Sequence, residues 1–200
     1  MGIISGALTF KSYIVEGYDH RNVDYELWLK KLNRGFFKPI NKDKSEKEAF
    51  GFTDNKDIFA EELEMKNTFF DNYVYFSFRR DTLKMQKSVI NHYIRKIEKE
   101  FTKKITKKEM KDIKERAEAK YIRELYPTIA SYEVTWNIET GFLYFFTQSR
   151  AVNEKFTEWF ERHMDLELTE VETATFAATI LSDEELVQFD KKSPSSLVSI

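Results

Sequence analysis

The spacing of apolar residues changes from a period of two to a period of about four near residue 84, and that change constrains the fold more than any other feature. In residues 69–81, FFDNYVYFSFRRD, side chains alternate with a period of two, and both faces are largely apolar. The following segment repeats apolar residues every four positions: Met85, Val89, Tyr93, Ile97 and Phe101. A period of two is typical of a strand, and a period of 3.6 is typical of a helix. The sequence therefore predicts a central strand and then an amphipathic helix of about five turns.

A second helix is expected after the first. Thr106 and Glu109 match a capping box, so this helix begins at Thr106 and ends before Pro127. The two helices predict a hairpin, and this hairpin is basic. Between Lys84 and Arg123 there are 14 Lys plus Arg and 6 Asp plus Glu, a local charge of +8 in a chain of formal net charge −2. The remaining residues therefore carry −10, and such asymmetry is typical of proteins that bind polyanions.

The other periodic segments predict a sheet. Strands are expected at 7–15, 50–53 and 165–177, a β-hairpin at 131–147, and helices at 25–34, capped by Asp24 or Asn22, and at 151–164. Residues 57–67 fit either a strand or a loop. The predicted fold class is α+β: an antiparallel β-sheet with packed helices and a projecting basic helical hairpin. Residues 1–83 and 128–181 form the two parts of the sheet domain, 84–127 the basic arm, and 182–200 an acidic, Ser-rich tail that is partly disordered.

Composition excludes several classes of protein. The chain has no cysteine, which excludes disulfides, thiolate metal sites and cysteine nucleophiles, and fits a reducing cytoplasm. The start, MGIISGALTF, has no basic segment and no apolar run long enough for a signal peptide. No segment approaches the roughly 18 apolar residues that a membrane span needs. We therefore expect a cytoplasmic protein that does not contact a membrane.

Catalysis is not expected. The stretch TDNKDIFAEELE offers four carboxylates whose spacing matches no metal-binding loop: Asp54, Asp57, Glu61 and Glu62. The three histidines, His20, His92 and His163, are scattered along the chain, and no Gly-rich phosphate loop or nucleophile elbow is present. The sequence thus predicts no catalytic residue, no metal site and no cofactor.

The lysines of the second predicted helix are the main candidates for a binding surface. Lys107, Lys111 and Lys114 are spaced to form one row beside the apolar stripe, and Lys103 and Lys104 extend it at the tip of the hairpin. A protein that binds DNA without sequence preference needs several cations on one surface, because these cations neutralise the phosphates. The candidate DNA-binding residues are Lys103, Lys104, Lys107, Lys108, Lys111, Lys114, Arg79 and Arg80.

Two structural explanations compete with this hypothesis. Four acidic residues alternate with the lysines, as on an ordinary solvated helix stabilised by ion pairs: Glu109, Asp112, Glu115 and Glu118. Arg79 and Arg80 point to opposite sides of the predicted strand, so at most one lies on a given surface and the other pairs with a carboxylate. Several aromatic residues could stack on single-stranded nucleic acid, although core packing explains most of them: Tyr73, Tyr75, Phe76, Phe78, Trp136, Tyr144 and Phe146. A protein-interaction module that assembles through Tyr93, Ile97, Phe101 and Tyr121 is the alternative function.

The order of motifs also resembles a known family. The strand GALTFKSYIVEG opens the chain, Gly51 and Phe52 follow a polar loop, and the strand 73–81 closes in Phe78, Arg79, Arg80 and Asp81. A lysine-rich arm at 99–123 and a hairpin, VTWNIETGFLYFFT, come next. Over residues 3–168 this order resembles the RdgC family of bacterial recombination-associated proteins.

The resemblance implies a function. Members of the family are cytoplasmic, nucleoid-associated homodimers that form a ring, bind double-stranded DNA without sequence preference, and restrain strand exchange by their recombinase partner, RecA. Its better-known members are longer and carry a further C-terminal region, whereas this chain ends in an acidic, Ser-rich tail. The resemblance therefore implies DNA contact more directly than it implies closure of a ring.

Overall fold

The computed structural model describes residues 9–99, 105–171, 182 and 185, and within these residues the fold is α+β. A seven-stranded antiparallel sheet has the order β2-β4-β5-β6-β1-β7, with β3 paired to β4. The strands are β1 (Lys11–Glu16), β2 (Glu48–Thr53), β3 (Phe69–Phe70), β4 (Tyr73–Thr82), β5 (Thr128–Asn137), β6 (Phe142–Phe145) and β7 (Glu167–Glu170). The prediction of an antiparallel sheet with packed helices is therefore confirmed.

β4 is central, as its two apolar faces predict. It pairs with β2 on one side and with β5 along ten residues on the other. Gly51 in β2 permits a close approach by the preceding chain, because a Cβ at this position would lie 2.3 Å from Cα of Phe37. That approach lets residues 35–37 bond to β2, with Phe37 N–H donating to Phe52 O at 2.8 Å. Local backbone packing thus accounts for the Gly-Phe pair of the sequence.

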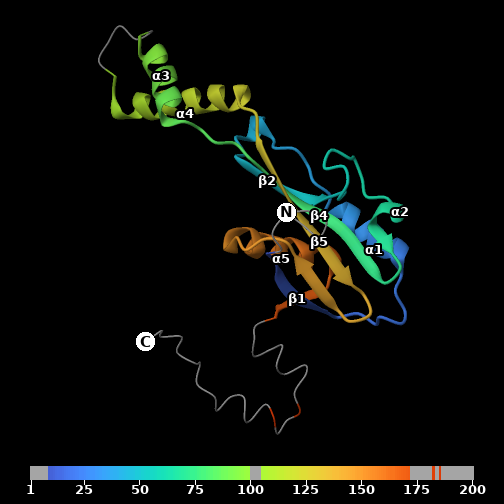
Figure 1. Ribbon diagram of the computed structural model, residues 1–200. Coiled ribbons are helices and arrows are strands. Elements are labelled where there is room, and N and C mark those ends of the chain that lie inside the picture. The colour runs from blue at the N-terminus through green and yellow to red at the C-terminus, as the bar shows by residue number, and fades with distance from the viewer. Residues whose placement is uncertain (1–8, 100–104, 172–181, 183–184, 186–200) are drawn as a thin grey trace.

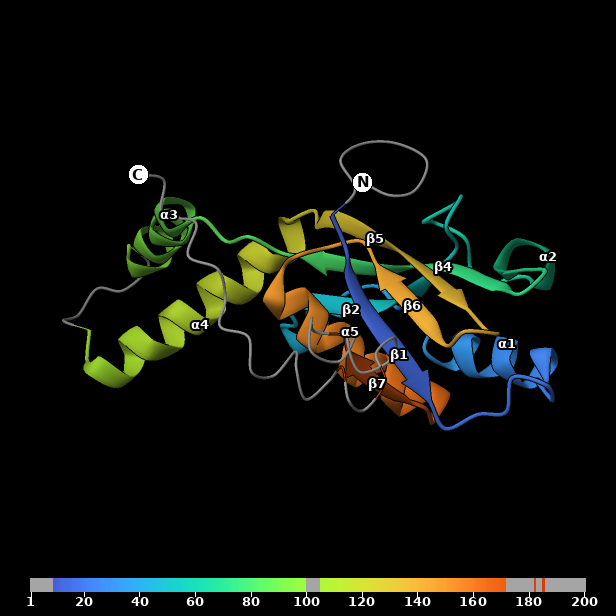
Figure 2. The ribbon, with the colours of Figure 1, turned by 60° about the horizontal axis from the view of Figure 1, so that its bottom comes forward.

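Two helices cover one face of the sheet. α1 (Tyr25–Arg34) begins at Asp24, whose side chain accepts from Leu27 N–H, and ends at Gly35. α5 (Arg150–Met164) packs beside it, and Figure 2 shows both helices on the same side of the strands. Trp28 of α1 stacks on Trp136 of β5 with ring centroids 4.4 Å apart, and Phe156 of α5 stacks on Phe145 at 4.1 Å. These aromatic contacts form the core.

The basic segment projects from the sheet. α3 (Lys87–Glu98) and α4 (Lys107–Glu124) lie side by side away from the strands in both views (Figures 1 and 2). They enter from the end of β4 and return into β5. We call residues 84–127 the arm and the described remainder, 9–83 and 128–171, the sheet domain. The expected projecting helical hairpin is therefore present.

Some element boundaries differ from the prediction. α3 has 12 residues, about three turns rather than five, because the backbone at its start is still extended at Gln86 and Lys99 closes its C-terminal end. Residues 57–67 are mostly loop, ended by the short helix α2 (Met65–Thr68). The polar loop before β2 contains a 3-10 turn, η1 (Lys42–Lys44). The predicted strand at 165–177 is described only as far as Glu170, and the predicted tail lies almost entirely outside the described residues.

Candidate nucleic-acid interface

The lysines of α4 are the most prominent cations of the arm. The capping box predicted at its start is present: Thr106 Oγ1 accepts from Glu109 N–H, and the Glu109 carboxylate accepts from Thr106 N–H at 2.7 Å. The hydrogen bonds that the Glu109 carboxylate accepts from the Thr106 N–H and hydroxyl hold its pKa below its ordinary value. The cap fixes where the helix begins, and with it the direction in which each following lysine points.

α4 has a buried apolar face, and exposed lysines lie beside that face. Its fully buried residues are Ile113, Ala117, Tyr121 and Ile122. Lys107, Lys111 and Lys114 are exposed and lie within one narrow sector of the helix, beside this buried face. We call these three residues the lysine row; at 1.5 Å per residue it spans about 10 Å. The flanking position expected from the sequence is thus observed, whereas Lys108 is exposed on a different side.

Most of these lysines are not neutralised by ion pairs. Lys107, Lys108 and Lys114 contact no carboxylate among the described residues, and Lys111 lies 3.9 Å from Glu115 with both side chains largely exposed. Pairs of this kind contribute little energy in water. The described arm residues, 84–99 and 105–127, hold 12 Lys plus Arg against 6 Asp plus Glu. The arm therefore presents a net positive surface.

Arg79 does not belong to that surface. Its side chain is buried on β4, where Nε and Nη2 donate to the two carboxylate oxygens of Asp81 at 2.8 Å and Nη1 donates to Ile58 O. The guanidinium also lies between the rings of Phe37 and Phe59. A buried guanidinium with these partners is a structural group, and it is not part of the exposed surface of the arm.

Arg80 points to the opposite face, as the alternation predicts. It is partly exposed, donates to Glu48 at 2.6 Å, and has a buried Nε without a hydrogen-bond partner among the described residues. The sequence allowed one of the two arginines to pair with a carboxylate, and both do. Lys103 and Lys104 lie outside the described residues. Of the candidate lysines that the structure describes, Lys107, Lys111 and Lys114 lie together in the lysine row, and Lys108 is exposed on another side of α4.

The aromatic candidates divide between the core and the helix-free face of the sheet. Phe76, Phe78, Trp136 and Phe146 are buried, so the core-packing explanation is correct for these four. Tyr73, Tyr75 and Tyr144 point away from the helices, in register with neighbouring strands. No cluster of exposed cations accompanies them among the described residues, so this face is a poor match for nucleic acid.

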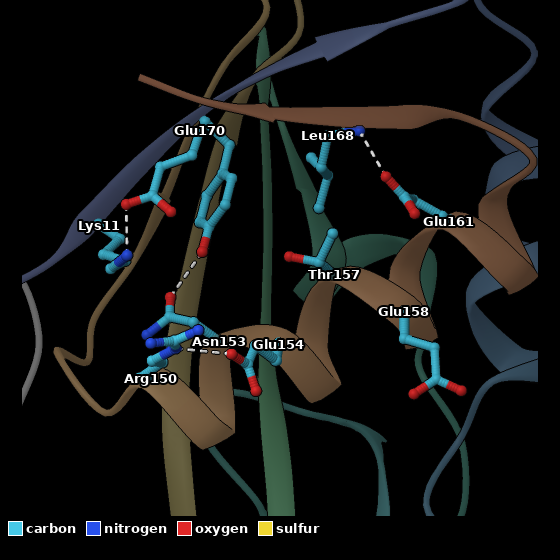
Figure 3. A pocket seen from close by; sticks show the side chains of 10 residues that line it. Lys11, Arg150, Asn153, Glu154, Thr157, Glu158, Glu161, Leu168 and Glu170 are labelled. Carbon is cyan, nitrogen blue, oxygen red and sulfur yellow. Dashed lines mark hydrogen bonds and ion pairs between the residues drawn. The ribbon is translucent and has the colours of Figure 1, made fainter. Parts of the chain in front are cut away.

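A hollow of about 750 Å³ lies between β1, β7 and α5 (Figure 3). Tyr13 lies at its floor and donates to Asn153 Oδ1 at 2.7 Å. Burial, with a smaller effect of the Glu170 charge, raises the pKa of Tyr13 to about 12. The phenol therefore stays neutral and acts only as a hydrogen-bonding group.

The carboxylates that line this hollow are already engaged. Glu170 pairs with Lys11, Glu154 with Arg150, and Glu158 with Lys155 and Arg162, and Glu161 accepts from Leu168 N–H. The pKa of Glu158 is lowered, because Lys155 donates to it and adds its positive charge. The hollow thus offers structural ion pairs in place of a free acid or base.

The acidic stretch and the histidines form no site in the described residues. Asp54 is buried and accepts from the N–H groups of Lys56 and Asp57, so it shapes a turn. His163 bonds to Trp159 O within α5, while His20 and His92 lie on other segments. No group of three or more ligating side chains is assembled in this part of the chain.

Comparisons with known proteins give no assignment. No protein-family model matches the chain, and no characterised protein matches its sequence. Among the described residues no helix is both long enough and apolar enough to cross a membrane. The function must therefore be argued from the geometry of the arm and from the resemblance.

Sequence reasoning missed the contacts at the base of the arm. Lys47 pairs with Glu118 at 3.6 Å, and Lys42 donates to carbonyls at the end of α4. Glu118 belongs to the same sector of α4 as the lysine row, so Lys47 offsets the one negative charge in that sector. The segment NKDKSEK has the composition of an ordinary polar loop. Nothing in its local sequence distinguishes a lysine that contacts a helix some eighty residues away from one that faces solvent.

Proposed function

We propose that the arm binds double-stranded DNA without sequence preference, through Lys107, Lys108, Lys111 and Lys114. The observation that carries the proposal is the lysine row: three exposed cations on one sector of a projecting helix, two of them without a carboxylate partner among the described residues. Phosphate contacts of this kind position a protein on DNA and carry no sequence information. The resemblance to the RdgC family supports the same ligand.

Salt dependence tests the proposal. Anisotropy of a labelled duplex should show affinity falling steeply with salt, because each neutralised phosphate contributes about 0.9 to the slope of log affinity against log salt. The variant Lys107→Glu, Lys111→Glu, Lys114→Glu should lose at least the three contacts of the row, a slope change of about 2.7. Absence of duplex binding at low salt would exclude the proposal.

A matched variant separates local charge from net charge. Lys30, Lys38 and Lys66 are exposed lysines of the sheet domain, and changing them to Glu alters the net charge by the same amount. This control should keep most of the affinity. Equal losses in the two triple variants would show that binding follows total charge and that the arm is not the interface.

The resemblance adds a biological setting to the proposal. A protein that covers duplex DNA would associate with the nucleoid and restrain strand exchange by a RecA-type recombinase. The corresponding assay measures strand exchange with increasing protein. The triple variant of the lysine row should inhibit less than the unaltered chain, and equal inhibition would separate the effect on recombination from DNA binding by the arm.

A second candidate function is self-association through α3. Its apolar residues, Val89, Ile90, Tyr93, Ile94 and Ile97, are each only half-buried, and the helix has no fully buried residue. Such a stripe would be covered in a homodimer. Sedimentation distinguishes this function from DNA binding, because an apolar interface responds weakly to salt and would be lost on changing Ile94→Glu.

A further inference from the structure

The arm meets the sheet domain at a small surface. The buried arm residues Ile113, Ala117, Tyr121 and Ile122 are separate from the hydrophobic cluster that forms the core of the sheet domain. Outside the arm, α4 makes its main contacts with η1. The direction of the arm is therefore determined by this short turn and by the two connecting segments, not by a shared core.

Lys42 of η1 contacts the end of α4 directly. Its ammonium donates to Leu125 O at 2.6 Å and to Arg123 O at 3.2 Å, and lies 5.9 Å from the ring centroid of Tyr126. The last carbonyls of a helix have no partner within the helix, and they form the negative end of its dipole. A cation at this position both satisfies these oxygens and is attracted to the dipole.

The turn that carries Lys42 is held in place on both sides. The Asn41 side chain accepts from the N–H groups of Asp43 and Lys44, and Glu46 accepts from Asn41 N–H at 3.0 Å. The turn leads into β2, and Lys47 O accepts from the N–H of the buried Leu83 at 2.8 Å, where the chain enters the arm. The same loop thus contacts the residue that precedes the arm and residues near the end of the arm.

Two ion pairs at this junction are weaker than the Lys42 contact. Arg123 and Asp43 are 3.3 Å apart with side chains 69% and 86% exposed, and the side chains of Lys47 and Glu118 are about half exposed. Exposed pairs of this kind contribute little and are screened by salt. Lys42 is only partly exposed and bonds to two carbonyl oxygens, so it is the principal contact between the loop and α4.

We propose that Lys42 is a positioning residue: its ammonium, seated on the C-terminal carbonyls of α4, fixes the direction of the arm relative to the sheet. Without this contact the arm would pivot about the connecting segments, Leu83–Gln86 and Leu125–Pro127. The consequence for DNA, that a fixed arm presents its lysines in one orientation, rests on the proposed function. The position of the arm itself does not depend on DNA.

The absence of cysteine makes a distance measurement direct. Spin labels on Asp112→Cys in α4 and Lys30→Cys in α1, both exposed positions, would be the only labels on the chain. Loss of hydrogen bonds to a charged group should lower the equilibrium constant for the docked arm at least about tenfold. Pulsed dipolar spectroscopy without DNA should therefore show a broader distance distribution in Lys42→Met than in the unaltered chain.

Matched variants make the result specific. Lys44 belongs to the same turn, is exposed and contacts no described carbonyl or carboxylate with its side chain, so Lys44→Met should leave the distribution unchanged. Lys42→Arg should restore most of the narrow distribution, because a guanidinium also donates to carbonyls. If Lys42→Met folds poorly by circular dichroism, Lys42→Leu provides the same test, because its side chain also has no donor. Equal distributions in the unaltered chain and the uncharged Lys42 variants would overturn the proposal.

Duplex binding by the same variants separates this inference from the proposed function. If the unaltered chain binds duplex, Lys42→Met should bind more weakly than Lys44→Met although both lose one charge. If the unaltered chain binds no duplex, the proposed function fails, while the distance distributions still decide the role of Lys42.

Discussion

The sheet domain and the arm are built in different ways. The sheet domain is stabilised by a continuous aromatic core in which Phe52, Phe76, Phe78, Phe145 and Phe156 are completely buried. The arm has a small buried cluster on one face of α4, and α3 contributes no fully buried residue to it. Long-range packing therefore stabilises the sheet domain, while the arm depends on caps and contacts within two helices.

The two regions also differ in charge. The described arm carries twice as many cations as acidic residues, whereas many cations of the sheet domain are paired, as Arg79 is with Asp81. A folded region with few buried contacts opens more readily than the core of the same protein. The surface proposed to bind DNA therefore lies on the region with fewer buried residues, which is expected to open more readily, and the following predictions test that difference.

Core truncation in the sheet domain should have the largest effect. The Phe156 ring is buried, and its centroid lies 4.1 Å from the ring centroid of Phe145 and 5.5 Å from that of Phe78. Phe156→Ala should lower the free energy of unfolding by about 3–5 kcal/mol, measured by urea denaturation. The exposed Leu27→Ala on α1 should cost about 0.5 kcal/mol or less. Similar losses for the two would contradict the central role of the aromatic core.

Adjacent arginines of β4 should differ almost as strongly. Arg79→Met leaves the buried carboxylate of Asp81 without its partner and should cost about 3 kcal/mol of unfolding free energy. Arg80→Met removes a partly exposed pair with Glu48 and should cost less than about 1 kcal/mol. Neither change should alter the salt dependence of duplex binding. If the folded Arg79→Met variant showed a smaller slope of log affinity against log salt, Arg79 would belong to the DNA interface.

Truncation in the arm should have a smaller and local effect. Ile113 is buried on α4, outside the core of the sheet domain, so Ile113→Ala should cost about 2 kcal/mol and act on the arm. Hydrogen exchange should become faster for amides of α3 and α4 and stay unchanged for β4 and β5. Equal acceleration in the sheet would show that the arm and sheet unfold as one unit.

Removing the cap of α4 should have a still smaller effect. Thr106→Ala loses the hydrogen bond that Thr106 Oγ1 accepts from Glu109 N–H and should cost about 1 kcal/mol, expressed as fraying of the first turn. Lys107 and Lys108 lie in that turn, so duplex affinity should fall slightly. Thr106→Ser should behave like the unaltered chain, and a loss in both variants would show that the methyl group, not the cap, matters.

Acid should weaken the same cap to the smallest extent. The pKa of Glu109 is lowered because it accepts hydrogen bonds from Thr106, so its contribution to stability is complete above the ordinary pKa of 4.5 and is lost as the pH falls toward the lowered value. Amide exchange at the start of α4, compared between pH 6 and pH values below about 4, should show this loss. In Glu109→Gln this change of exchange rate with pH should be absent. A change of equal size in that variant would show that another group titrates.

Much of the fold could be predicted from patterns within a few residues. The two-residue period marks β4, the four-residue period marks α3, and Thr106 with Glu109 marks the first turn of α4. These signals are reliable because strand alternation and helix caps involve residues close in sequence. The lysine row follows from the same reasoning, since helix geometry alone places Lys107, Lys111 and Lys114 in one sector.

Only the tertiary structure decided the roles of residues whose partners are distant. Arg79 and Arg80 are neighbours in the sequence, yet the loop at 54–63 covers the face of Arg79, while Arg80 is partly exposed on the opposite face. Lys42 resembles its neighbour Lys44 until the chain path brings α4 beside it, across about eighty residues. Alternation predicts on which side of a strand a side chain lies. Whether that side chain is buried depends on which other segments of the chain pack against that side. The sequence by itself thus determined the elements and the cations of the arm, and the path of the chain determined which charges remain at the surface.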